Sequence, residues 1–226
     1  SLIPLFSQSN AYIDLHKFSA SYGNDIMGLV IQDTILYGIS KTGGSSNKGA
    51  IFSFNIKTNT FINLKDFVGG TDDGAYPFDN LIISGNYLFG STAIGGNTNN
   101  GVLYKIKRDG SDYQVLHHYN SPNSPTGVGG VYFILDSNYI YFTFRGSGIN
   151  NEYGYLAKVK DDGSAYQLLH TFNQSNDGKY AESLLKIGEY IYGVTLTGGN
   201  NNEGTLYKIK KDSTNYSIIK SFVNSS

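Results

Sequence analysis

Histidines are the first residues of this sequence to consider for chemistry. The sequence holds four of them and no cysteine, which excludes a thiolate nucleophile and a cysteine-ligated zinc site. His16, His117 and His170 occupy one position of an internal repeat, where Lys65 and Lys220 stand in the other units. A position that accepts either histidine or lysine does not serve as a base or a metal ligand. We expect its stem to pack on neighbouring rings.

The carboxylates of the longer polar segments form a second candidate group. They are Asp72, Asp73, Asp79, Asp177 and Glu182. Carboxylate oxygens suit calcium, but the spacing in "TDDGAYPFD" does not match an EF-hand loop, so solvated turn residues are the favoured interpretation. Two facing acids would also serve a glycosidase, yet no unrepeated, inward-facing pair stands out. We therefore expect no catalytic residues, no metal and no cofactor.

A run rich in glycine and asparagine, "GVTLTGGNNNEGTLYK" at residues 193–208, could be a phosphate cradle, a linker or a turn. No P-loop lysine and no predicted helix follow its glycines, which disfavours phosphate binding. The motifs GxSxG and HExxH are also absent from the sequence. Related runs follow "ILYGIS", "YLFGST" and "YIYFTF" earlier in the chain, so the run belongs to a repeating unit.

The repeat has a regular period. Its equivalent residues Leu36, Leu88, Ile140 and Ile191 stand 52, 52 and 51 positions apart. Each unit contains four short segments with strand-like alternation, separated by turn residues, and none shows helical periodicity. Four antiparallel strands per unit of about 50 residues predict an all-β fold of the β-propeller type. A β-sandwich is the runner-up, but it would not repeat with one fixed period.

We expect a single propeller domain over residues 1–226, with full repeats at 19–67, 68–119, 120–172 and 173–222. Residues 1–18 align with residues 205–222 at a constant offset of 204. They would form the third and fourth strands of an N-terminal half blade. A ring of five blades that lacks part of its last blade is the favoured arrangement. A fragment of a longer repeat domain, or an open half blade that pairs with a second chain, stays as an alternative.

Charge and hydropathy limit the classes of partner that we expect for the protein. Lysine and arginine total 17 against 18 aspartate and glutamate, so no net positive field would attract nucleic acid. No apolar run approaches the ~20 residues that a membrane-spanning helix needs. We expect no nucleic-acid partner and no membrane span.

The segment "GGTDDGAYPFDNLIISGNYLFGSTAIGGNTNNGVLYKIKRDGSDYQVLHHY" at residues 69–119 resembles the GloVer-type tandem repeat. The resemblance extends over nearly the whole chain and implies a secreted or cell-surface bacterial protein of undefined role, with no catalytic residues. Two departures stand out. Only Pro77 keeps the proline that opens the family's unit, and the third unit has Tyr141 and Phe142 where the others have "YG" or "FG", followed by "RGSG".

In a four-stranded blade the longer connections emerge together on one face, where binding sites are usually found. Six residues of these connections are our candidates for ligand contact: Tyr76, Asn99, Arg145, Tyr153, Tyr180 and Asn201. The favoured function is a non-catalytic binding or structural module, whose partner is a protein or a glycan on a surface. A carbohydrate-binding propeller is the alternative, and a glycoside hydrolase comes third. Similar side chains in every unit would favour a multivalent lectin, whereas one unusual unit would favour a single protein-binding site.

Overall fold

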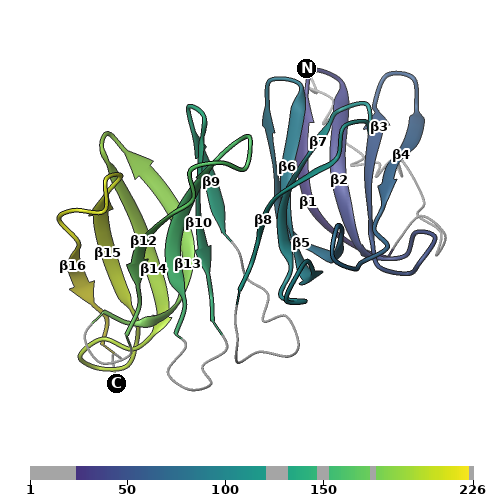
Figure 1. Cartoon of the computed structure of the whole chain (residues 1–226). Helices are drawn as coiled ribbons and strands as arrows, with labels where there is room; N and C mark the ends of the chain where they lie inside the picture. Colours follow the sequence, from purple (N-terminus) through teal and green to yellow (C-terminus); the bar gives the residue numbers. More distant parts are fainter. Residues whose placement is uncertain (1–23, 121–131, 147–152, 174–176, 224–226) are drawn as a thin grey trace, which may run out of the picture.

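The chain is built from β-strands in a computed structural model that describes residues 24–120, 132–146, 153–173 and 177–223. Four sheets of four antiparallel strands follow one another in chain order (Figure 1). The all-β prediction and the four-stranded antiparallel unit are confirmed. The predicted half blade at residues 1–18 lies outside the described residues. Within the described ranges, no helix is present that could cross a membrane.

The strand bounds repeat from sheet to sheet. The first sheet holds β1 (Asn24–Gln32), β2 (Ile35–Thr42), β3 (Ala50–Asn55) and β4 (Thr60–Asp66). The second holds β5 (Gly74–Ser84), β6 (Tyr87–Gly95), β7 (Val102–Lys107) and β8 (Gln114–His118). The third holds β9 (Phe133–Asp136), β10 (Tyr139–Phe144), β11 (Tyr155–Lys160) and β12 (Gln167–Thr171). The fourth holds β13 (Lys179–Ile187), β14 (Tyr190–Thr197), β15 (Thr205–Lys210) and β16 (Ser217–Ser221).

Tight turns join the strands within each sheet. The first residue of every turn between the first two strands has a positive φ of 55 to 59°, at Asp33, Gly85, Ser137 and Gly188. The turn between the last two strands is fixed by an aspartate in three sheets. Asp109, for example, accepts hydrogen bonds from the backbone N–H of Ser111 (2.9 Å) and from its hydroxyl (2.6 Å). These side-chain bonds supply the turn chemistry that keeps neighbouring strands in register.

Hydrophobic clusters fill the three junctions between consecutive sheets. At each junction, aliphatic and aromatic side chains from both sheets form one buried cluster. The cluster between the first and second sheets includes Phe67 and Tyr104, and the one between the third and fourth includes Phe172 and Tyr207. The core of the chain therefore lies between the sheets, and stacking rather than any single sheet buries the apolar side chains.

A glycine of the second strand lets an aromatic ring lie flat on the sheet. A Cβ on Gly90 would stand 2.3 Å from the Tyr104 hydroxyl, and one on Gly193 equally close to the Tyr207 hydroxyl. The third sheet reverses this arrangement, because Phe142 replaces the glycine and pairs directly with Ala157. The third unit therefore departs from the others at Phe142 because the large and the small side chain have changed places between two paired strands.

Candidate functional site

The six predicted contact residues lie in the connections and at the strand ends next to them. Tyr76 belongs to β5 and Tyr180 to β13, Asn99 and Asn201 lie in the loops before β7 and β15, and Arg145 and Tyr153 flank the connection from β10 to β11. The structure brings three of them together, namely Arg145, Tyr153 and Tyr180. The other three, Tyr76, Asn99 and Asn201, lie apart from this group, in other parts of the structure.

Arg145, Tyr153, Lys179, Tyr180 and Glu182 form a mixed cationic and aromatic group, which we call the Arg145 cluster. The Arg145 guanidinium carbon stands 5.3 Å from the centre of the Tyr180 ring, and one guanidinium nitrogen is 3.9 Å from the Glu182 carboxylate. The Lys179 ammonium lies 5.4 Å from the Tyr180 ring and 5.8 Å from the Tyr153 ring. Residues of the third and fourth sheets therefore meet here.

Backbone geometry fixes the position of Tyr180. Its φ is +60°, an uncommon value for a bulky residue, and its N–H donates to the Tyr153 carbonyl at 2.9 Å. Tyr76 has the same geometry, with a φ of +55° and an N–H that donates to the Lys48 carbonyl at 2.8 Å. In both units the unusual conformation joins the start of one sheet to a loop of the preceding sheet.

The Arg145 cluster is suited to binding rather than to proton transfer. The Arg145 side chain keeps 35% of its surface exposed and that of Glu182 keeps 25%, so both stay accessible from solvent. At 3.9 Å, a partly exposed ion pair contributes little to stability. Cations over tyrosine rings, by contrast, present charge and flat apolar surface together, which suits carboxylates and aromatic groups of a ligand.

Asn99 has a structural task in its own loop. Its φ is +59° and its side-chain oxygen accepts a hydrogen bond from the Gly95 N–H at 3.2 Å. Asn47 and Asn202 make the same bond with Gly43 and Gly198. Asn201 is exposed, and its amide donates to the Phe222 carbonyl at 3.2 Å. Ligand contact by Asn99 and Asn201 stays a prediction.

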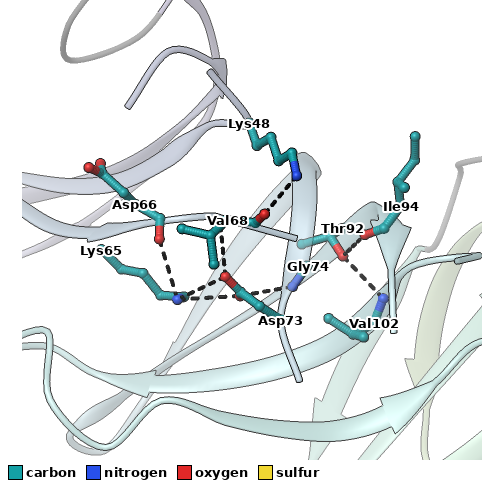
Figure 2. Close-up of polar contacts among 9 residues, drawn as sticks. All are labelled: Lys48, Lys65, Asp66, Val68, Asp73, Gly74, Thr92, Ile94 and Val102. Atoms are coloured by element: carbon teal, nitrogen blue, oxygen red, sulfur yellow. Dashed lines mark hydrogen bonds and ion pairs between the residues drawn. The ribbon is translucent and has the colours of Figure 1, made fainter. Parts of the chain in front are cut away.

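Buried carboxylates stabilise the links between sheets. Asp73 accepts hydrogen bonds from the backbone N–H groups of Val68 and Gly74, both at 2.8 Å, and lies 3.3 Å from the Lys65 ammonium (Figure 2). The nearby Lys48 ammonium donates to the Val68 carbonyl at 2.7 Å. Asp73 is 7% exposed, so its interpretation as a solvated turn acid is wrong. The link between the two sheets needs an internal acceptor for its N–H groups.

Asp177 has the same role at the third junction. Its carboxylate accepts a hydrogen bond from the Asn173 N–H at 2.6 Å and lies 2.6 Å from Nε2 of His170. At 4% exposure, Asp177 is not a solvated turn acid either. Asp72 is exposed, and the side chain of Asp79 lies outside the described part. Across the described ranges, no three acidic or histidine side chains gather as a metal site.

At the three junctions, the repeat position shared by lysine and histidine packs on rings, as predicted. The Lys65 ammonium lies 4.1 Å from the centre of the Tyr113 ring, and the His170 imidazole stacks on Tyr216 at 3.7 Å. His117 stacks on Tyr166 at 4.6 Å. In each case the ring belongs to the following sheet. Burial, and then the neighbouring His118, lower the pKa of His117 to about 4, so its imidazole is neutral near pH 7.

The sequence also matches a known repeat. The profile described as the Gloeobacter/Verrucomicrobia repeat matches residues 5–152. The chain belongs to this family. The match confirms the GloVer-type resemblance drawn from residues 69–119, and it includes Arg145, whereas the other members of the Arg145 cluster lie beyond it. A search of curated proteins finds no relative of this Gloeobacter/Verrucomicrobia repeat chain.

Three solved structures show weak likeness to this Gloeobacter/Verrucomicrobia repeat chain. A chain of a nidogen/laminin complex is 13% identical over 84% of this chain and 78% of its own, with a TM-score of 0.45. The tricorn protease is 10% identical over 89% of this chain and 23% of its own, with a TM-score of 0.38. Xyloglucan PUL GH43B of Bacteroides ovatus is 15% identical over 92% of this chain and 43% of its own, with a TM-score of 0.45. At these scores the likenesses support no conclusion about ligand or activity.

Proposed function

We propose that this protein is a non-catalytic binding module, secreted or displayed on a bacterial cell surface, which captures a protein partner at the Arg145 cluster. The observation that carries the proposal is the meeting of Arg145 and Tyr180 across the third junction. Two cations and two tyrosines on one partly exposed surface form the kind of anchor that dominates protein interfaces.

The Arg145 cluster lies at the junction of the third and fourth sheets and is not repeated at the first junction, which favours a protein ligand. At the first junction the positions of Arg145, Tyr153 and Lys179 hold Lys41, Lys48 and Ala75, and the position of Glu182 holds Phe78. A multivalent lectin would present similar groups at each junction. A single distinct patch instead fits one protein-binding site.

The contacts of two buried acids support the absence of catalysis. The most buried acids of the links, Asp73 and Asp177, are both committed to backbone N–H groups and to a neighbouring cation or imidazole. Acids held in this way are not free to serve as the acid and base of a glycosidase. A hydrolase therefore stays the third candidate.

A glycan is the second candidate ligand, because Tyr153 and Tyr180 lie next to each other. Sugars stack on exposed aromatic faces, but here Arg145 and Lys179 already lie over the Tyr180 ring. A sugar would have to displace a cation from that ring. We therefore rank glycan binding below protein binding.

The fold that goes with this function is a β-propeller in which the four sheets are blades and residues 1–18 begin a fifth. The stacking of sheets in chain order and the clusters at each junction support it. Localisation rests on the family resemblance, and fractionation of the source cells with an antibody to the chain tests it.

Binding is tested with two probes, a peptide array rich in acidic and aromatic sequences and a glycan array. We expect peptide binding, and we expect Arg145→Ala to weaken it about tenfold or more, as truncation of a central interface arginine does. Lys41→Ala is the matched control, because Lys41 holds the same repeat position at another junction, and it should leave binding unchanged.

Two results would contradict the proposed site. Equal peptide affinity in the wild type and in Arg145→Ala would place binding elsewhere. Binding to glycans alone, with loss in Tyr153→Ala, would favour the lectin.

A further inference from the structure

The outward face of the fourth sheet is apolar and open. Leu185, Ile219 and Phe222 expose 60%, 47% and 41% of their surface. A hollow of about 180 Å³ lies in the same face, between Leu185, Tyr192 and Leu206. Contiguous exposed apolar surface of this kind marks an interaction site.

The residues of this face stand at repeat positions that are packed in all three other sheets. In the third sheet the same positions hold Ile134, Tyr141, Leu156, Leu169 and Phe172, and all five pack in the cluster with the fourth sheet. The second sheet uses Ile82, Phe89, Leu103, Leu116 and Tyr119 against the third. The first sheet uses Val30, Tyr37, Ile51, Leu64 and Phe67 against the second. The open face of the fourth sheet therefore repeats a face that elsewhere receives the next sheet.

A lysine on the same face also indicates that a further sheet packs there. The Lys105 ammonium donates to the Asp161 carbonyl of the third sheet at 2.8 Å, and the Lys158 ammonium donates to the Lys211 carbonyl of the fourth at 2.7 Å. Both lysines also lie over a ring of their own sheet, Tyr87 and Tyr139, at 5.0 and 5.2 Å. Lys208 lies over Tyr190 in the same way, at 5.2 Å. A docked sheet would present a turn carbonyl to Lys208.

The first residues of the chain carry the matching sequence. At the offset of 204, Ile3, Leu5 and Tyr12 align with Tyr207, Ile209 and Tyr216. In the fourth sheet those three residues pack against the third sheet. Ser7 aligns with Lys211, whose carbonyl accepts the Lys158 bond. Residues 1–18 thus have, at the aligned sequence positions, the apolar residue types and the turn position that the open face requires.

We propose that the occupant of this face is residues 1–18 of the same chain, docked as the third and fourth strands of a fifth sheet, with Lys208 donating to the Ser7 carbonyl. The inference rests on the propeller arrangement proposed above and is independent of the ligand. Docking brings the N-terminal segment against the last sheet and closes the stack into a ring. Such closure leaves the Arg145 cluster accessible at its own junction.

Cross-linking tests the contact, since the chain has no native cysteine. Ser7→Cys with Lys208→Cys is the test pair, and Lys158→Cys with Lys211→Cys is the matched control at the third junction. After treatment with a short bismaleimide, both pairs should give cross-linked single chains, identified by mass spectrometry of the linked peptides. Each single-cysteine variant should give none.

The outcomes separate the possible occupants. A control pair that links while the test pair does not would overturn the proposal. Links between two chains in the test pair would also overturn it, in favour of a second copy on the open face. A control pair that fails to link would overturn the stacking of sheets on which the inference rests. None of these results bears on peptide binding, so failure here is distinguishable from failure of the binding proposal.

A second variant tests the apolar contact itself. Leu185→Asp should lower the cross-linking yield of the test pair severalfold and leave the control pair unchanged. Ile62→Asp is the matched control, because Ile62 is also exposed (52%) but stands where the other sheets have Gln114, Gln167 and Ser217. Equal yields with Leu185→Asp and Ile62→Asp would contradict docking on this face.

Discussion

At the scale of single residues, each junction pairs a basic side chain of one sheet with a tyrosine ring of the next. The Lys65 ammonium has the Asp73 carboxylate at 3.3 Å, and the His170 imidazole likewise has the Asp177 carboxylate at 2.6 Å. His117 differs, because its ring is held between Tyr166 and Phe142. One repeat position therefore has two electrostatic settings, one beside a carboxylate and one among rings.

This difference predicts an acid sensitivity that belongs to His117. Its folded pKa of about 4 lies below the usual value of 6.5, so folding favours the neutral imidazole. Its contribution to stability is complete above about pH 6.5 and is lost as the pH falls toward 4, by up to ~3 kcal/mol. Urea unfolding at a series of pH values measures the loss.

His117→Phe keeps an aromatic ring at that position and cannot take up a proton, so its stability should fall less between pH 6.5 and pH 4. His118→Gln is the comparison: it removes only the smaller cause of the His117 pKa shift, so its acid loss should stay larger than that of His117→Phe. An acid loss of the same size in His117→Phe would assign the effect to other groups.

At the scale of elements, the third sheet shows how paired strands share volume. Phe142 and Ala157 are directly paired and both fully buried, whereas the other sheets pair a glycine with an aromatic residue. The two strands keep the same spacing because one large and one small side chain fill the same space.

The exchange can be tested by reversing it. Phe142→Gly alone should cost about 3 to 5 kcal/mol through the cavity that it leaves, and Ala157→Tyr alone should cost ~1 to 3 kcal/mol through overpacking. The double variant restores the pattern of the second and fourth sheets, so we expect it to be at least ~1 kcal/mol more stable than Phe142→Gly. Additive losses in chemical denaturation would refute the exchange.

Sequence patterns were sufficient to predict the elements and insufficient to predict their contacts. The period of Leu36, Leu88, Ile140 and Ile191 and the alternation of each segment predict the four-stranded units. Phe142 was visible as a departure, but its link to Ala157 needed the strand register. Lys179 was missed, although it directly precedes Tyr180.

Two further features could not be predicted from the sequence without knowing how neighbouring sheets are placed. Arg145 and Tyr180 belong to different units, and no local pattern shows that their loops meet. Asp73 and Asp177 resemble solvated loop acids because each directly precedes a glycine in a polar run, and only the chain path of the link buries them. The signal that could have found them is their shared repeat position.

At the scale of the whole molecule, stability comes from stacking. Three clusters link four sheets in a row, and the inner sheets contribute apolar residues to two clusters each. In Figure 1 the first and fourth sheets stand at the two ends of this row. A ring closed within one chain would join these ends without a second molecule.

Closure within one chain predicts a melting temperature that does not depend on protein concentration. Association between copies would instead raise the melting temperature with concentration by mass action. Scanning calorimetry over about a hundredfold range of concentration distinguishes the two. A steady rise would contradict closure and agree with links between chains.

The likeness of the three junctions has a consequence for how such a chain changes in evolution. Because each sheet offers the same five positions to its successor, an in-frame duplication of one unit would supply both halves of a new interface at once. Chain length could then change in steps of about one period, 51 or 52 residues, without a compensating change elsewhere in the core. The Arg145 cluster draws its residues from two consecutive units, so it would be copied only when both are duplicated together, and recombination could in that way vary the number and the position of binding sites separately from the scaffold.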